Sequence, residues 1–139
     1  DGITGDPENL KIDWLGFEGG DLVATIDLGK TISIEELGLS SCEVTSAGVF
    51  LPPTVEFSVS LNGKDFKSVA TTTTEVPKKQ SVGTRILSTK IKEVKARHLR
   101  VHAKNLGTIP DWHQAKGRKA WLFIDEILVN PQRSRKNHR

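Results

Sequence analysis

The protein has 139 residues, which is the length of a single domain. Hydrophobic residues make up 36% of it, a low share that suits a sheet protein with one face of each sheet in water. The tail PQRSRKNHR holds four positive charges, and removing it takes the formal net charge from +3 to −1. We therefore expect no basic face that would bind nucleic acid.

The cysteine and methionine content indicates which disulfides can form and whether the chain is a processed product. Cys42 is the single cysteine, so no internal disulfide forms. No apolar run reaches the length of a transmembrane helix, and no signal peptide is recognised. Methionine is absent, position 1 included, and we expect a processed product or a piece of a longer protein. We predict a monomeric folded module over residues 1–130 and a basic, disordered tail over residues 131–139.

Apolar and polar residues alternate in three segments, 22–29, 54–63 and 97–103. A period of two residues is typical of strands that bury one face. The side chains expected on the buried faces are Leu22, Ala24, Ile26, Leu28, Val55, Phe57, Val59, Leu61, Leu99, Val101 and Ala103.

Weaker strand patterns occur at 32–41, 66–74 and 85–91, and residues 121–129 (WLFIDEILV) read as a buried closing strand. Asn62-Gly63 indicates a hairpin turn, and Leu51-Pro52-Pro53 ends one strand before the next begins. No segment supports a helix of ordinary length. Short strands with frequent turns predict an all-β sandwich or barrel.

Four blocks of the sequence resemble those of a known family. They are DGITGDPENLKIDWLGFEGGDLVATIDLGK, FLPPTVEFSVSLNGKDF, ARHLRVHAKNLG and WLFIDEILV, in that order over residues 1–130. The pattern is similar to that of the discoidin domains, also called coagulation factor V/VIII type C domains. More narrowly, FLPPTVEFSVS and PDWHQAKGRKAWLFIDEI resemble the family 32 carbohydrate-binding modules attached to bacterial β-hexosaminidases, or chitobiases.

The resemblance implies a jelly-roll β-sandwich of the galactose-binding-domain type, with ligand loops at one end. It also implies a bound structural calcium ion and a periplasmic or secreted owner at the bacterial cell surface. For the metal we expect ligands among Asp1, Asp6 and Glu126, with loop carbonyls. Glu126 stands in an apolar strand, where a carboxylate is costly unless it is paired, metal-bound or exposed to water.

The segment NLGTIPDWHQAKGRKAWLF, residues 105–123, begins as a loop because Gly and Pro interrupt it. The Trp112 ring suits the apolar face of a pyranose, while Asp111, His113 and Arg118 suit its hydroxyls. In the alternative interpretation, Trp112 folds back as a plug over the end of the sandwich. The sequence leaves these two roles open.

The other aromatic residues are interpreted mainly as packing. Trp121 opens the closing strand and is expected in the core, as the anchor of the loop. Trp14 is also expected to pack. Phe50, before the strand that follows Pro53, is either an exposed ligand platform or, as we favour, a cap of the core.

We find no grouping that supports catalysis. His98 and His102 share the outward face of a strand, which indicates a solvated polar face rather than a zinc site. No Gly-x-Ser-x-Gly motif and no phosphate-binding glycine pattern is present.

We therefore predict a non-catalytic accessory module of a glycoside hydrolase, β-N-acetylhexosaminidase or chitobiase in type, with the catalytic domain covalently linked. Its expected ligand is a carbohydrate of the N-acetylhexosamine or galactose kind. Two alternatives stay open: a structural domain that packs against the enzyme, or a lipid or protein adhesion module using Phe50, Leu51 and Trp112.

Overall fold

The computed structural model describes residues 2–4 and 9–130, with side chains from residue 15 onward. The described residues form strands and one short 3-10 helix, Thr45–Ala47. The strands are β1 (Gly2–Thr4), β2 (Asn9–Glu18), β3 (Leu22–Val44), β4 (Thr54–Ser60), β5 (Lys67–Thr73), β6 (Val82–Ala103) and β7 (Trp121–Val129). No helix in the described part of the chain has the length and hydropathy of a membrane span.

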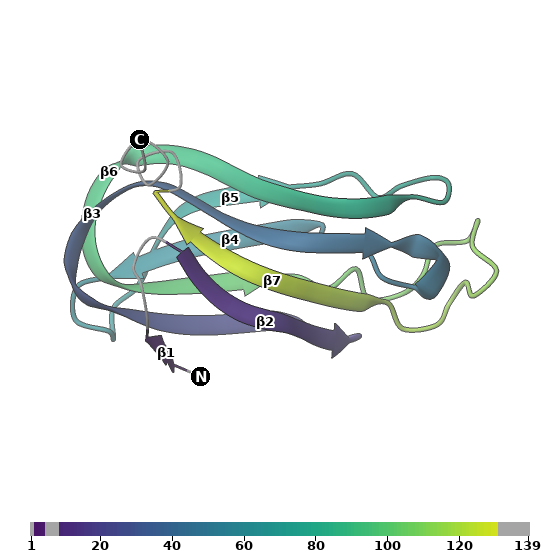
Figure 1. The fold of residues 1–139 in the computed structure, drawn as a ribbon, viewed down its shortest axis with the longest axis horizontal. Coiled ribbons are helices and arrows are strands. Elements are labelled where there is room, and N and C mark those ends of the chain that lie inside the picture. Colours follow the sequence, from purple (N-terminus) through teal and green to yellow (C-terminus); the bar gives the residue numbers. More distant parts are fainter. Residues whose placement is uncertain (1, 5–8, 131–139) are drawn as a thin grey trace.

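Two strands, β3 and β6, are much longer than the others, with 23 and 22 residues. They pair with each other and bend together at one end of the molecule, so that each runs through both layers (Figure 1). The pairing register shifts between Asp27 and Ile32, which marks the bend of β3. β-Bulges and irregular pairing of this kind let a strand change direction.

The bends divide the sheet into two layers. One layer joins β1, the first part of β3, the last part of β6, β4 and β5. The other joins β2, β7, the last part of β3 and the first part of β6. The layers face each other across one hydrophobic core (Figure 1). The predicted all-β fold, a jelly-roll β-sandwich, is confirmed.

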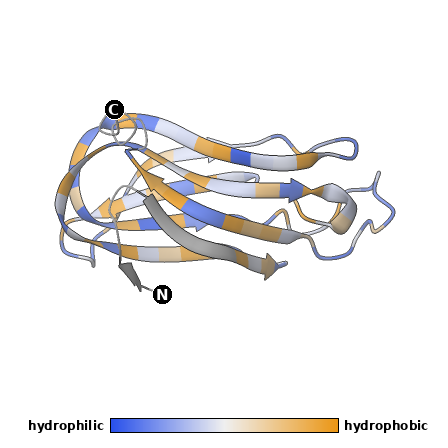
Figure 2. Cartoon of the chain, viewed as in Figure 1, coloured by the Kyte–Doolittle hydropathy of each residue, from blue (hydrophilic) through white to orange (hydrophobic). Residues whose placement is uncertain are grey.

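The core consists of the inward faces that alternation predicts, and the strands show this as alternating bands of hydropathy (Figure 2). All but one of the side chains expected to be buried are at most 5% exposed. The prediction for Leu61 is wrong: its side chain is 64% exposed. The reason is local, because β4 ends at Ser60 and the chain has already entered the turn.

The turn after β4 forms as the Asn62-Gly63 pair predicts. Gly63 has φ 78°, a left-handed conformation that glycine adopts without strain. The Asn62 Oδ1 atom accepts hydrogen bonds from the backbone N–H groups of Lys64 and Asp65. The weaker patterns also form strands: 32–41 lies in β3, 66–74 contains β5 and 85–91 lies in β6.

In β7 the inward side chains are Leu122 and Ile124, which are 1% and 0% exposed. Trp121 and Phe123 alternate with them and are half-exposed. Trp121 is therefore not a core residue, and this corrects the sequence interpretation. Because nearly all residues of this strand are apolar, the residue types do not show its two-residue period.

Four connections meet at the end of the sandwich opposite the bends (Figure 1). They are residues 19–21, 45–53, 74–81 and 104–120. Here the connection 104–120, which contains most of the predicted ligand segment 105–123, comes next to segments that are distant from it in sequence. The basic tail, 131–139, lies outside the described residues.

Candidate functional site

The loop 104–120 is fixed at its start by Asn105, which is 3% exposed. Its side-chain N–H groups donate to the carbonyls of Phe17 and Gly20, and its backbone N–H donates to Asp21 Oδ1 at 2.8 Å. Burial acts to raise the pKa of Asp21, but the hydrogen bonds from Asn105 and His102 outweigh it, and the pKa falls below its ordinary value. The loop therefore starts from a rigid point.

The rest of the loop closes on itself as a compact hairpin. The N–H of Ala120 donates to the Gly107 carbonyl, and Ile109 and Arg118 are joined by a hydrogen bond of 2.9 Å. Gly107 and Gly117 have φ of 94° and 83°, which explains why glycine stands at both positions. The glycines that break up the sequence thus build this hairpin.

A second loop, 45–49, is attached to the first residue of β7. The N–H of Trp121 donates to the Gly48 carbonyl at 2.8 Å, and the Trp121 carbonyl accepts from the N–H of Phe50 at 3.0 Å. Gly48 has φ 79° and ends the short helix. Trp121 is therefore held by its backbone while its indole remains half-exposed.

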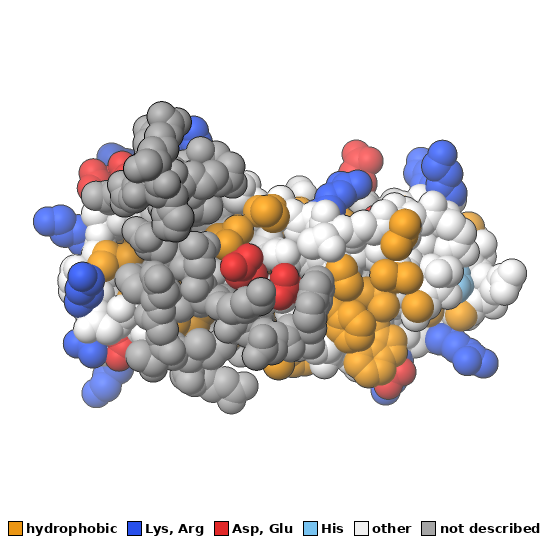
Figure 3. Space-filling model, viewed as in Figure 1, with side chains coloured by type: hydrophobic (Ala, Val, Ile, Leu, Met, Phe, Trp, Pro, Cys, Tyr) orange, Lys and Arg blue, Asp and Glu red, His pale blue; other side chains and the backbone are white. Residues whose placement is uncertain are grey.

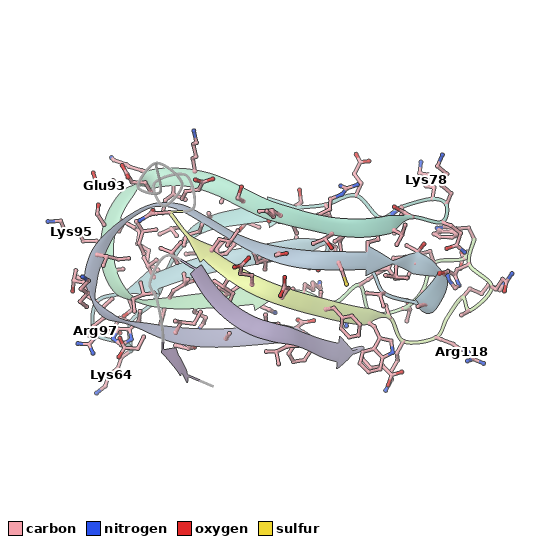
Figure 4. The ribbon with its side chains drawn as sticks, in the orientation of Figure 1. Lys64, Lys78, Glu93, Lys95, Arg97 and Arg118 are labelled. Carbon is pink, nitrogen blue, oxygen red and sulfur yellow. The ribbon has the colours of Figure 1, made fainter. Side chains whose placement is uncertain are left out.

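The two loops and the end of β2 enclose a depression of about 250 Å³, which we call the loop-end depression. Trp121 lines it together with Glu18, Arg118 and Lys119, whose side chains are exposed. Figure 4 shows Arg118 extending outward at this end of the molecule. The remaining lining residues are Ser46, Ala47, Gly48, Ile109, His113 and Ala115.

Trp112 stands beside this depression and does not line it. Its side chain is half-exposed, like that of Trp121, but it packs against a small second core of Phe50, Ile109 and Ala120. Its indole Nε1–H donates to the Pro77 carbonyl at 2.8 Å. This is the geometry of the plug, since the polar atom of the ring is already paired.

His113 is 7% exposed, and both of its ring nitrogens are bonded to the backbone. Nδ1 accepts from the N–H of Ala115 at 2.8 Å, so this nitrogen carries no proton. Nε2, 2.7 Å from the Thr45 carbonyl, must then be the protonated donor. The ring joins the two loops, and neither nitrogen remains for a ligand in this structure.

The other predicted ligand residues are spread apart. Phe50 is 2% exposed in the second core, so its ring forms no platform, which is the position of a cap. Asp111 is exposed on the hairpin but does not line the depression. Of the residues proposed from sequence, His113 and Arg118 reach the depression, whereas Asp111, Trp112 and Phe50 do not.

Sequence reasoning missed Glu18, Lys119 and the exposure of Trp121. A period-two reading of residues 121–129 would have placed Trp121 outward, opposite Leu122 and Ile124. Glu18 carries no comparable signal, because its place beside the loop depends on how β2 pairs with β7.

The structure describes the side chain of one of the three predicted calcium ligands, Glu126. Asp1 and Asp6 lie outside the described residues. Glu126 is half-buried in β7, and in the strand register its backbone lies opposite Lys11 of β2 and Ser40 of β3. Among the described residues, no group of three or more His, Cys, Asp or Glu side chains forms a metal site.

Comparison with known proteins gives similar solved structures only. No protein-family model and no curated protein matches the chain. A CBM32 module of CpGH89 from Clostridium perfringens, solved with GalNAc-β-1,3-galactose, is 17% identical, with a TM-score of 0.44 over 73% of this chain and 62% of that one.

Two further structures are similar. CBM32-3 of a family 31 glycoside hydrolase from Clostridium perfringens is 13% identical, with a TM-score of 0.49 over 91% of this chain and 78% of that one. The C-terminal domain of a chitobiase from Bacteroides fragilis is 17% identical, with a TM-score of 0.41 over 78% and 64%. The chain thus spans less than two thirds of the CpGH89 module and of the chitobiase domain.

Proposed function

We propose that this chain is a non-catalytic carbohydrate-binding module and that it holds a sugar ring in the loop-end depression. One observation carries the proposal: a half-exposed indole, Trp121, forms the wall of a depression that also presents Glu18, Arg118 and Lys119. An aromatic face covers the C–H face of a pyranose, and charged side chains bond its hydroxyl rim. Trp121 takes the stacking role that the sequence suggested for Trp112.

The expected binding is weak, because an open depression of about 250 Å³ buries little of a ligand. A dissociation constant of about 1 mM corresponds to roughly −4 kcal/mol. Attachment to a catalytic domain makes this affinity useful, because it raises the effective concentration of the substrate. We propose a parent of the β-hexosaminidase or chitobiase type, placed outside the cytoplasm, and an N-acetylhexosamine or galactose-type ligand.

A second candidate function is docking against the attached catalytic domain. A hydrophobic patch lies over the ends of β2 and β7 (Figure 3). The rings of Trp121 and Phe123 lie 5.7 Å apart on the outward face of β7, and both are half-exposed. Exposed apolar patches mark interaction surfaces, so this patch favours a structural role as the alternative.

The two tryptophans provide a matched test. Titration calorimetry with N-acetylglucosamine, N-acetylgalactosamine and galactose gives the sugar affinity of the wild type, Trp121→Ala and Trp112→Ala, and thermal melting gives their stability. We expect Trp121→Ala to abolish binding and to stay folded. We expect Trp112→Ala to lose roughly 2 kcal/mol of stability or more, because its packing and its hydrogen bond to Pro77 are lost.

The reverse pattern, in which Trp112→Ala loses binding at unchanged stability, would restore Trp112 as the stacking residue. A wild type that binds none of the sugars would favour the docking role. Docking would be contradicted if the module binds sugar in isolation and its removal from the parent protein leaves the stability of the catalytic domain unchanged.

A further inference from the structure

A second hollow, which we call the flank groove, lies between the end of β5 and the start of β6. Its volume is about 600 Å³, within the range of ligand sites in proteins. Leu51, Val76, Pro77 and Leu87 supply its apolar part. The flank groove shares no lining residue with the loop-end depression. It is therefore a separate place on the molecule.

The flank groove contains a buried carboxylate. Glu43, near the end of β3, lines it and is only 4% exposed. Among the described residues, Glu43 accepts one hydrogen bond, from Ser81 Oγ at 2.7 Å, and takes part in no ion pair. A carboxylate has room for several donors. Glu43 thus offers acceptor capacity to a ligand in the groove.

The position of Glu43 is fixed by a network of hydrogen bonds. Thr45 and Ser81 are joined by backbone and side-chain bonds, with Ser81 N–H donating to Thr45 Oγ1 at 2.8 Å. Thr45 also accepts the Nε2–H of His113. Pro77, another lining residue, accepts the indole N–H of Trp112 at its carbonyl. The groove is therefore preorganised, which lowers the entropic cost of binding.

The charges around the flank groove balance. Glu43 and Glu75 are opposed by Lys78 and Arg85, so the lining has no net charge. Figure 4 shows Lys78 on the upper rim of the loop end, away from Arg118. A balanced lining favours a neutral ligand over an anion or a cation. A ligand that donates hydroxyls to Glu43, accepts from Arg85 and rests a C–H face on Leu51 and Leu87 meets these conditions.

We infer that the flank groove is a second saccharide site, in which Glu43 accepts hydroxyl hydrogen bonds and Arg85 donates to the ring or hydroxyl oxygens. It shares no lining residue with the loop-end depression. A chain with both sites holds two sugar units, or two points along one glycan, and so gains avidity over either site alone.

The test is a titration followed by backbone amide NMR, which reports the two places separately. The probes are galactose, N-acetylglucosamine and N,N′-diacetylchitobiose. Amides of Val76, Ser81 and Leu87 report on the flank groove, whereas those of Ala47 and Lys119 report on the loop-end depression. We expect at least one probe to shift the flank amides in the wild type.

Two variants address the flank groove, and a third is their control. Glu43→Gln keeps the shape of the side chain but removes its charge, and should weaken the flank response about tenfold or more. Arg85→Ala changes an exposed residue at the rim and should weaken it without affecting folding. Lys90→Ala, an exposed cation further along β6, should leave both responses unchanged.

The inference is overturned if no probe shifts the flank amides, or if the flank response persists in both Glu43→Gln and Arg85→Ala. A flank response to methylammonium with none to any sugar also overturns it, because the ligand class would be cationic. If the sugars shift the flank amides of the wild type but not its loop-end amides, the result counts against the proposed function and supports the second site.

Discussion

Asp27 shows how one side chain holds the bend of β3. Its Oδ1 atom accepts from the N–H of Gly29 at 2.8 Å and from Arg97 Nε at 2.9 Å, and its Oδ2 atom accepts from Arg97 Nη2 at 3.0 Å. The bidentate pair thus links β3 to β6 where both strands leave one layer. The hydrogen bond from Arg97 lowers the pKa of Asp27 from 3.8 to about 2, with a further contribution from Gly29.

This shift predicts a dependence of stability on acid. Because the pKa of Asp27 is lower in the folded state, its contribution is complete above pH 3.8 and is lost as the pH falls toward 2. We expect Asp27→Asn to flatten the fall in stability over this window. Denaturant unfolding at a series of pH values measures how the free energy of unfolding changes over this window. Glu56→Gln, on the exposed face of β4, is the control and should keep the wild-type slope; equal slopes for Asp27→Asn and wild type would contradict the prediction.

At the level of the strands, the structure depends on how closely β3 and β6 approach. Gly38 is paired with Ser88 and is buried. A Cβ atom at Gly38 would lie 2.8 Å from the Leu87 carbonyl oxygen and 2.8 Å from Ser88 Cβ. Backbone stands in the way there, so relief requires a shift of the strand pair.

We therefore expect Gly38→Ala to destabilise the fold by about 1–3 kcal/mol, as overpacking in a core does. Gly20→Ala is the matched control, because a Cβ at Gly20 meets nothing within 4 Å. Its effect should stay within about 0.5 kcal/mol. Urea unfolding measures the free energy of unfolding of both variants. Equal values for Gly38→Ala and Gly20→Ala would show that β3 and β6 have room to separate.

Across the whole molecule, the bends of β3 and β6 lie at one end and the four connections lie at the other (Figure 1). The loop-end depression and the flank groove are both at or near the connection end. Lys95 and Arg97 project from the bend end (Figure 4). The rigid sandwich thus carries its candidate sites on loops, as in other scaffolds that bind through their loops.

Calcium binding remains a prediction about the whole folded module. If Glu126 and the N-terminal acids hold the ion, it binds the folded state only, and the melting temperature rises with calcium concentration. Glu126→Gln should remove most of this rise, while Glu56→Gln should keep it. Differential scanning calorimetry with calcium and with a chelator measures both. A melting temperature indifferent to calcium and chelator would show that no such site operates.

The inward faces of the strands could be read directly from the chain. Leu22, Ile26, Phe57 and Val101 are buried as alternation predicts, because the two-residue period is a local property of an extended backbone. The hairpin at Gly63 was equally local. The continuity of β3 was not a local property. Residues 22–29 and 32–41 were predicted as two strands, and their union depends on pairing with β6.

The candidate sites depended on contacts between distant segments. The sequence pointed to the segment 105–123 and to Arg118, but it offered Trp112 as the ligand candidate and placed Trp121 in the core. Trp112 is turned inward by the Pro77 carbonyl, 35 residues away. Trp121 is left half-exposed because its strand buries Leu122 and Ile124 instead. A period of two residues specifies which face is buried, whereas the partner of a loop side chain is set only when the loops meet in the folded chain.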